Sequence, residues 1–175
     1  MDTSFGISLQ VGVIQSNRCG DIDPFIVPFL QKEGLSLDEV LDGLTKRGGL
    51  LGISGVSNDL RDVQEAADAG NDRAKLAIDV FCNGIVRHIG AYYAELGGLD
   101  HLVFTGGIGE HGTRIRESVC HQLAHMGILL DDKKNQNCTG ANTVISRDDS
   151  PVTIHVIPAN EELGVARKTY AYLRT

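Results

Sequence analysis

Glycine constrains this chain more than any other residue type, because 21 of its 175 residues are glycine and many of them stand in clusters. The clusters occupy positions 48–49, 52, 55, 97–98 and 106–109. Clustered glycines form tight turns, and the missing side chain also lets the backbone approach a ligand closely. The residues around each cluster decide which of these two interpretations applies.

The cluster at residues 106–109 separates a short apolar run from a helical pattern. Residues 101–105 favour a strand, and apolar residues recur at helical spacing between Ile115 and Met126. A strand, a glycine turn and a helix in succession form an α/β unit that presents backbone N–H groups at a helix N-terminus. The cluster lacks the lysine and spacing of a P-loop and the glycine order of a dinucleotide fingerprint. Nucleotide contact and a purely structural turn therefore both remain open.

Several other patterns predict helices. The longest helical pattern covers residues 72–96, where apolar residues recur every three to five positions. A capping box that starts at Ser36 predicts a shorter helix. Three further helices are expected to start at capping residues, namely Asp23, Ser57 and Asn160.

Strands and loops are predicted between these helices. Strands are expected at four further places, namely residues 4–14, 128–130, 143–146 and 152–157. The glycine-rich residues 50–56 are expected to form a connector, and the polar residues 131–142 a loop. The sequence therefore predicts one α/β body with a terminal helix.

Composition argues against several function classes. Sixteen basic and 23 acidic residues give a net charge of −7, so a general nucleic-acid or anionic-membrane surface is not expected. The sequence has no apolar run long enough to span a membrane, and its N-terminus lacks the pattern of a signal peptide, which predicts a cytoplasmic protein. The four widely separated cysteines predict reduced thiols rather than a zinc site. Five histidines are interpreted as structural or surface residues, namely those at 88, 101, 121, 125 and 155.

Three polar segments besides the glycine turn could carry chemistry. Arg18 offers a fork of donors to a phosphate or carboxylate, but it could instead pair with Asp21 or Asp23 within its own loop. Asp59 could accept from ribose hydroxyls and Arg61 could lie against a base, although helix capping is the favoured interpretation of this segment. Carboxylates at the start of the last helix, Glu161 among them, either complement the helix dipole or hold Mg²⁺.

Taken in order, four motifs closely resemble those in the C-terminal half of acetate kinases and their propionate kinase relatives. The motifs are R-C-G-D-I-D-P, G-L-L-G-I-S-G-V-S-N-D-L-R-D, F-T-G-G-I-G-E and I-P-A-N-E-E-L-G-V-A-R. The resemblance covers essentially the whole chain. It implies an RNase H-like α/β nucleotide-binding domain of the actin, Hsp70 and sugar kinase superfamily, present here in incomplete form. It also implies transfer of the γ-phosphoryl group of ATP to a short-chain carboxylate, and the reverse reaction.

The resemblance also implies a role for particular residues. Arg18 is similar to the arginine that stabilises the phosphoryl group in flight. Glu161 matches the carboxylate associated with Mg²⁺, and Asn160 would position it. The remaining matches are to nucleotide-contacting residues, namely Asp59, Leu60, Arg61, Gly107, Ile108 and His111, of which His111 stands where many relatives carry asparagine.

The resemblance finally implies what accompanies this chain. ATP or ADP, Mg²⁺ and a short-chain carboxylate or acyl phosphate are the expected ligands, and a homodimer is the expected assembly. Residues 1–160 would form the C-terminal nucleotide-binding domain without its first strand, and residues 161–175 a helix that packs on the missing N-terminal domain. We expect the chain to be inactive alone. The alternative is a non-catalytic dimerisation or regulatory module derived from such a kinase.

Overall fold

The chain divides into two compact units, Met1–Gly98 and Leu99–Thr175, in a computed structural model that describes residues 2–139 and 142–174. The sequence predicts a different division, at residue 160, between a nucleotide-binding domain and its last helix. In the structure that helix falls within the second unit, together with the strands. Thr175, the last residue of the expected helical segment, lies outside the described residues.

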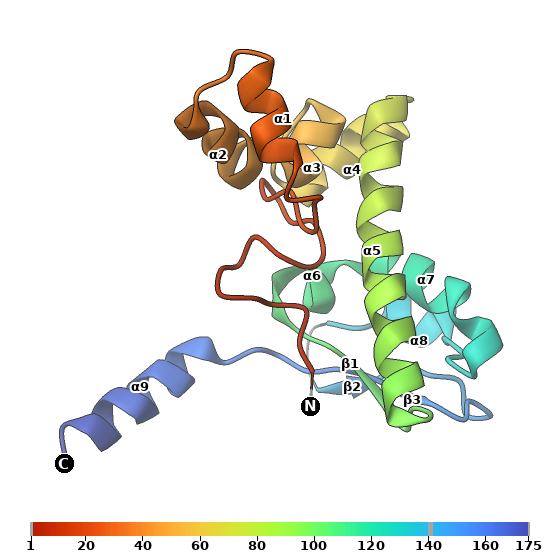
Figure 1. The fold of residues 1–175 in the computed structure, drawn as a ribbon. Coiled ribbons are helices and arrows are strands. Elements are labelled where there is room, and N and C mark those ends of the chain that lie inside the picture. The colour runs from red at the N-terminus through yellow and green to blue at the C-terminus, as the bar shows by residue number, and fades with distance from the viewer. Residues whose placement is uncertain (1, 140–141, 175) are drawn as a thin grey trace. The chain divides into compact units, whose positions relative to one another are not determined.

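The first unit is helical. Its described helices are α1 (Ile26–Lys32), α2 (Leu37–Lys46), α3 (Gly49–Ser54), α4 (Leu60–Asp68) and α5 (Asp72–Leu96). Helices α3 and α4 both lie against α5, as Figure 1 shows. Small residues on α5, Ala74 and Ala77, are fully buried there together with Leu50 of α3 and Val63 of α4. Because alanine side chains are short, the helix backbones can approach closely and still bury the larger apolar groups.

Local capping signals predict two of these helices correctly. Helix α5 has the predicted bounds; the side chain of Asn71 caps its start, and Gly97 ends it with a left-handed backbone at φ 70°. The predicted capping box of α2 is also confirmed, since the Ser36 hydroxyl accepts from the Glu39 N–H and the Glu39 carboxylate accepts from the Ser36 N–H.

The prediction of strands at residues 4–14 is wrong. None of the described residues in this segment belongs to a strand. Gly12 adopts φ 92°, which breaks an extended path, and its N–H donates to the Asp21 carboxylate at 2.8 Å. The Asp21 N–H in turn donates to the Gly12 carbonyl at 3.0 Å. These two bonds tie the segment into a loop instead of a sheet, and an isolated pair of short strands would be marginal in water.

The glycine-rich connector predicted at residues 50–56 is largely the helix α3. The N–H groups at a helix start need acceptors, and here a neighbouring loop supplies them. Leu50 and Leu51 donate to the carbonyls of Gln15 and Ser16, each at 2.9 Å. These tertiary bonds outweigh the low helix propensity of glycine.

Two predicted helix starts are displaced by a few residues. Helix α1 begins after Phe25, whose N–H donates to the Asp23 carboxylate at 2.9 Å, so Asp23 stabilises the preceding turn rather than the helix itself. Helix α4 is capped by Asp59 rather than by Ser57, because the Ser57 hydroxyl accepts from the Asp59 N–H at 3.0 Å.

The second unit is built around a small sheet. Its described elements are β1 (His101–Phe104), α6 (Gly106–His111), α7 (Thr113–Gln122), the 3₁₀ turn η1 (Ala124–Met126), α8 (Asp132–Gln136), β2 (Thr143–Val144), β3 (Thr153–Val156) and α9 (Glu161–Tyr172). The strand order is β1-β3-β2, with β1 parallel and β2 antiparallel to β3. On β3, Ile154 and Val156 are buried, and His155 between them points to the other face.

Two predictions about this unit are confirmed only in part. The strand expected at residues 128–130 is reduced to a single bridge between Leu130 and Ser146. The loop expected over residues 131–142 contains α8, which the Asp131 carboxylate caps, and positions 140 and 141 lie outside the described residues. Such a short helix gives almost no periodic pattern in the sequence.

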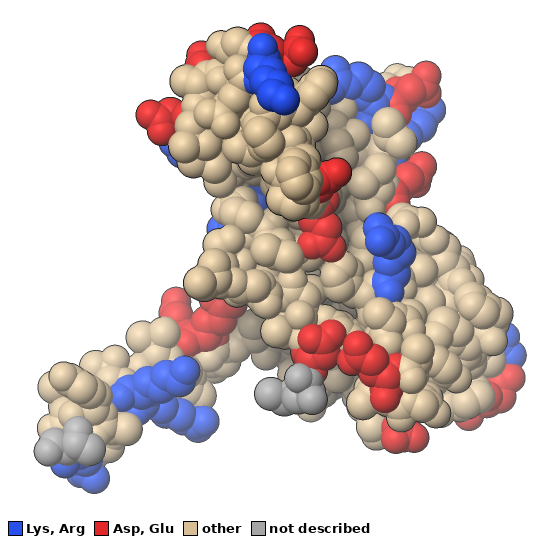
Figure 2. All heavy atoms as spheres, in the orientation of Figure 1, with Lys and Arg blue, Asp and Glu red and all other residues tan. Residues whose placement is uncertain are grey.

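The terminal helix α9 starts as predicted, since the Asn160 side chain accepts from the Leu163 N–H at 3.0 Å. The helix begins with acidic side chains and continues with basic ones, which Figure 2 shows as red and then blue. This order complements the helix dipole. Its predicted apolar face is exposed, with Leu163 at 42% and Leu173 at 76%. Across the described residues, no helix is long and apolar enough to cross a membrane.

Candidate functional site

The glycine turn after β1 contains one glycine that the fold itself does not require. Gly106 needs its positive φ of 73°, and a Cβ on Gly109 would come within 3.2 Å of the Phe104 backbone. Gly107 has neither constraint, because a Cβ placed there would meet nothing within 4 Å. Its missing side chain therefore leaves backbone open toward free space, which favours ligand contact over a purely structural turn.

This open backbone faces a pocket of about 450 Å³. The pocket is lined by two segments far apart in the sequence, namely Gly106, Gly107, Glu110 and His111 from α6, and Ala159, Asn160, Glu161 and Glu162 from the start of α9. The structure thus brings together three predicted site residues from two separate segments, namely Gly107 and His111 from one and Glu161 from the other. Ile108, predicted with them, lies half-buried in α6.

Glu110 links these two segments directly. Its carboxylate accepts from the Ala159 N–H at 2.8 Å, which fixes the chain just before Asn160 and Glu161. No sequence pattern predicts a role for Glu110 itself, although it ends the glycine motif. A carboxylate placed directly after a glycine turn was the available signal, but its partner is 49 positions away along the chain.

The Arg116 guanidinium holds the other end of the glycine helix. This side chain of α7 is fully buried and donates to the carbonyls of Gly109 and Glu110 at 2.9 and 2.8 Å. It also donates to the Asn135 side chain of α8 at 2.7 Å. Burial lowers the pKa of Arg116 from its ordinary value, yet a guanidinium remains charged in proteins. The charge therefore satisfies the last carbonyls of α6 and joins three helices.

The acidic side of the pocket fits a magnesium ion bound together with phosphate. Glu161 and Glu162 are exposed on the first turn of α9, and Glu110 lies opposite them. Among the described residues, no group of three or more His, Cys, Asp or Glu side chains is arranged to hold a metal. Mg²⁺ needs no such cage, because it keeps several waters and takes one or two carboxylates plus substrate phosphates.

Arg18 lies in the first unit, on a loop that packs against the start of α3. Its guanidinium donates to the Gln15 side chain at 3.0 Å, so the predicted alternative of pairing with Asp21 or Asp23 is not what the structure records. Gly49 allows the loop to approach, because a Cβ there would lie 1.9 Å from the Gln15 carbonyl oxygen. The loop geometry thus depends on a glycine in the left-handed region, at φ 59°.

Asp59 and Arg61, also in the first unit, form a paired surface group at the start of α4. The Asp59 carboxylate accepts from the Arg61 N–H at 2.9 Å and from its guanidinium Nε at 3.0 Å. The Arg61 guanidinium lowers the pKa of Asp59 to about 2. Capping, the favoured interpretation, is therefore confirmed, while the Arg61 side chain stays 88% exposed and free to lie against a ligand. Leu60 between them is buried in the core.

Comparison with known proteins decides the family. A model of the acetokinase family matches residues 1–167 of this chain. The chain belongs to the acetokinase family.

Acetokinase relatives resemble the chain over nearly its whole length. It is similar to the acetate kinase of Treponema denticola, with 47% identity over 99% of this chain, and to that of Dictyoglomus thermophilum, with 51% identity over 97%. The chain spans 44% and 42% of these two proteins, which is less than half of their length.

Solved acetokinase structures share the fold. The crystal structure of Porphyromonas gingivalis acetate kinase matches 97% of this chain with a TM-score of 0.89 and 42% identity, over 43% of its own length. A propionate kinase from Francisella tularensis matches 93% with a TM-score of 0.85 and 39% identity, over 41% of its own length. The predicted α/β fold class and the predicted family are therefore confirmed.

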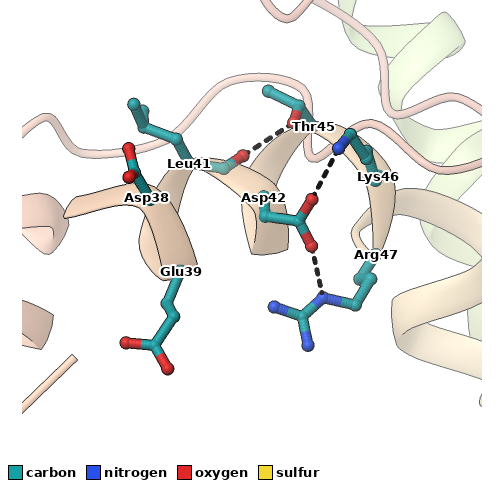
Figure 3. Close-up of a pocket in the computed structure, with 7 residues that line it drawn as sticks. All are labelled: Asp38, Glu39, Leu41, Asp42, Thr45, Lys46 and Arg47. Atoms are coloured by element: carbon teal, nitrogen blue, oxygen red, sulfur yellow. Dashed lines mark hydrogen bonds and ion pairs between the residues drawn. The ribbon is translucent and has the colours of Figure 1, made fainter. Parts of the chain in front are cut away.

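A second pocket of this acetokinase chain is lined by residues of α2 and by Arg47, none of which is a predicted site residue. Figure 3 shows its basic side chains, Lys46 and Arg47, paired with Asp42. Asp42 accepts from Lys46 at 2.8 Å and from Arg47 at 3.1 Å. Because these charges are already satisfied on the protein surface, we assign this pocket no ligand.

Replacing Arg116 with Met should destabilise the second unit by about 3 kcal/mol, because the last carbonyls of α6 and the Asn135 amide lose a charged donor inside the core. Hydrogen exchange of the α6–α8 amides measures this loss. Arg167→Met on exposed α9 serves as the control and should change stability by less than about 0.5 kcal/mol. Equal protection in both variants would contradict the role of the buried guanidinium.

Replacing Arg61 with Ala should raise the pKa of Asp59 from about 2 part of the way toward its ordinary value, because the charged donors are lost and only the backbone N–H remains. A carboxylate whose pKa is lowered by folding stabilises the protein above its unfolded pKa of about 4, and this contribution disappears as the pH falls further. A carbon-13 NMR titration of Asp59 gives the value. Arg147→Ala removes a similar arginine fork, on Asp149, and should leave Asp59 unchanged.

Proposed function

We propose that this chain provides the nucleotide-binding part of a kinase that transfers the γ-phosphoryl group of ATP to acetate or propionate and also catalyses the reverse reaction. The observation that carries the proposal is the pocket between α6 and the start of α9, where an open glycine backbone faces the carboxylates of a second family motif. Relatives named acetate kinase and propionate kinase support the reaction class.

The nucleoside would be bound by groups that the structure leaves accessible. Gly107 lets the backbone of α6, including that of Ile108, approach adenosine, and His111 lines the same pocket with its exposed ring. Asp59 keeps lone pairs for a ribose hydroxyl even while it accepts from Arg61, since each carboxylate oxygen accepts more than one hydrogen. The flat, exposed guanidinium of Arg61 is suited to stack on a base. Because Leu60 is buried, it would contribute through its backbone.

The acidic residues of the pocket would act together with Mg²⁺. Glu110, Glu161 and Glu162 would repel the phosphates of ATP unless a divalent cation bound between them. Glu161 would hold the hydrated ion from the first turn of α9, with Asn160 fixing that turn by its cap. When bound, the ion neutralises charge that develops on the transferring phosphoryl group.

Arg18 would stabilise the phosphoryl group during transfer. Phosphoryl transfer depends mainly on positioning and on electrostatic stabilisation, and a guanidinium offers five N–H donors. The Gln15 side chain accepts from one terminal nitrogen of Arg18 and so orients the planar group. The other donors remain available to phosphoryl oxygens.

The same proposal covers setting and assembly. We propose a cytoplasmic protein that forms homodimers and binds neither nucleic acid nor membranes, in line with its net charge of −7. The second candidate function is a non-catalytic dimerisation or regulatory module. The exposed apolar side chains of α9 and of its C-cap residue, among them Val165 and Leu173, favour it because they are available to a partner. A chain that dimerises without binding nucleotide would support this alternative.

Replacing Gly107 with Ala should weaken Mg²⁺–ATP binding at least about tenfold, measured by calorimetry, because the added methyl group occupies the space that the nucleotide needs. The variant should be as stable as the parent or more so, since the site is helical and free of clashes. Gly43→Ala on α2, equally free of clashes, is the control and should bind normally. If the parent chain gives no heat with Mg²⁺–ATP, nucleotide binding by this chain is refuted.

The purified chain alone should form no acetyl or propionyl phosphate above the level of its Arg18→Ala variant. Its motifs supply nucleotide and phosphoryl contacts, whereas orientation of the carboxylate acceptor requires groups beyond them. Hydroxamate detection of acyl phosphate is a suitable assay. A rate that exceeds the Arg18→Ala background would show that the 175 residues already suffice for catalysis.

A further inference from the structure

Two histidines from different strands meet on the sheet of the second unit. His101 begins β1 and His155 lies on β3, and the two strands pair in parallel with Val103 opposite His155. Nδ1 of His101 and Nε2 of His155 are 3.1 Å apart, and their ring centroids are 5.2 Å apart. From the sequence alone, both are interpreted as structural or surface residues. Their pairing depends on the register of strands that are 54 positions apart.

The sheet holds the His155 ring in a defined position. Because its neighbours Ile154 and Val156 are buried, His155 points to the opposite face of β3. The residues paired with it on either side are Val103 of β1 and Val144 of β2, each 46% exposed. Side chains opposite each other across strands lie in contact range, so the two valines flank the imidazole and restrict its rotation.

We propose that His101 and His155 form a two-imidazole binding site for a divalent transition metal of the zinc, nickel and copper class. A metal at about 2.05 Å from two nitrogens places them roughly 2.9 Å apart at a right angle and roughly 3.3 Å apart at the tetrahedral angle. The 3.1 Å separation in the structure lies between these values, so the two nitrogens can share one ion without changing their separation, once each ring turns its lone pair from the other nitrogen toward the ion. Imidazole is a preferred ligand of these metals.

The hydrogen bond between the rings is the metal-free state of this pair. Metal binding needs a lone pair on Nδ1 of His101 and on Nε2 of His155, so the hydrogen between them moves to the far nitrogen of its own ring. Water completes the coordination, since among the described residues no third His, Cys, Asp or Glu side chain joins the group. Two protein ligands predict an affinity well below that of a closed four-ligand site.

This site is independent of the proposed kinase function. The pocket between α6 and α9 offers carboxylate oxygens, which suit Mg²⁺, whereas the histidine pair offers only nitrogen. Mg²⁺ therefore should not bind the pair, and ATP should not compete with zinc for it. Failure of one site leaves the other untouched.

The experiment titrates ZnCl₂ into the full chain and follows the histidine ring nitrogens by nitrogen-15 NMR, with calorimetry for the affinity. We expect the resonances of His101 and His155 to shift together, and MgCl₂ to shift neither. His101→Ala and His155→Ala should each lower the affinity at least about tenfold. His121→Ala is the matched control, because His121 forms another exposed pair, with Asp132 at 3.1 Å. It should leave the zinc-induced shifts of His101 and His155 unchanged.

Each other outcome would overturn the proposal. Zinc that binds equally well to both alanine variants is held elsewhere, for example by thiols. Absence of any shift in the His101 and His155 rings at millimolar zinc means that the pair binds no metal. Because both residues lie at the sheet surface, a folding defect in one variant would show in its backbone spectrum, and His155→Gln then provides a second, smaller change that removes the same ligand nitrogen.

Discussion

The candidate pocket depends on the buried guanidinium of Arg116. Its N–H groups donate to neutral oxygens of Gly109, Glu110, Thr113 and Asn135. The guanidinium therefore stabilises the fold as a multiple hydrogen-bond donor rather than through an ion pair. A short helix such as α6 cannot satisfy its own last carbonyls. The Arg116 guanidinium donates to these carbonyls at the end of α6, while the start of the same helix remains open to the pocket. Stability at one end of α6 is therefore what permits an exposed, glycine-lined backbone at the other.

In the first unit, the unsatisfied groups at a helix end are paired with backbone atoms alone. No charged side chain is needed at the start of α3, because backbone carbonyls of the loop that carries Arg18 accept from the first N–H groups of that helix. Gly49 makes this possible, because any side chain there would overlap the Gln15 carbonyl. In both units, hydrogen bonds at one end of a short helix therefore fix a candidate site residue. In the first unit the start of α3 holds the loop of Arg18, and in the second unit Arg116 holds the end of α6, which carries Gly107. Precision at a phosphate-binding site requires this kind of support, since small displacements of a charged group weaken electrostatic stabilisation strongly.

Features whose determinants are close together in the chain could be predicted from the sequence, and features that depend on distant partners could not. Helix α5 and the capping role of Asn160 were predictable because their determinants are neighbours in the chain. Helix α3 was not, since distant carbonyls provide its acceptors, and residues 4–14 lack the strand partners that their alternation requires. The ordered motifs identified the family and predict Gly107 and Glu161 as site residues. They could not show that Glu110 joins the two segments, or that strand register brings His101 to His155.

The start of α9, which lines the second side of the pocket, is held in place by few contacts. Glu161 stands on α9, whose described residues are all exposed, so this helix gains almost no burial energy within the chain. Two contacts fix its start, the Asn160 cap and the bond from Ala159 to Glu110. Hydrogen bonds at such exposed positions are each worth about 1 kcal/mol, too little to hold a carboxylate rigidly. A nucleotide that contacts this side of the pocket would therefore bind more tightly once another surface covers the apolar side of α9. The helix would then be ordered before the nucleotide binds, so binding would lose less conformational entropy.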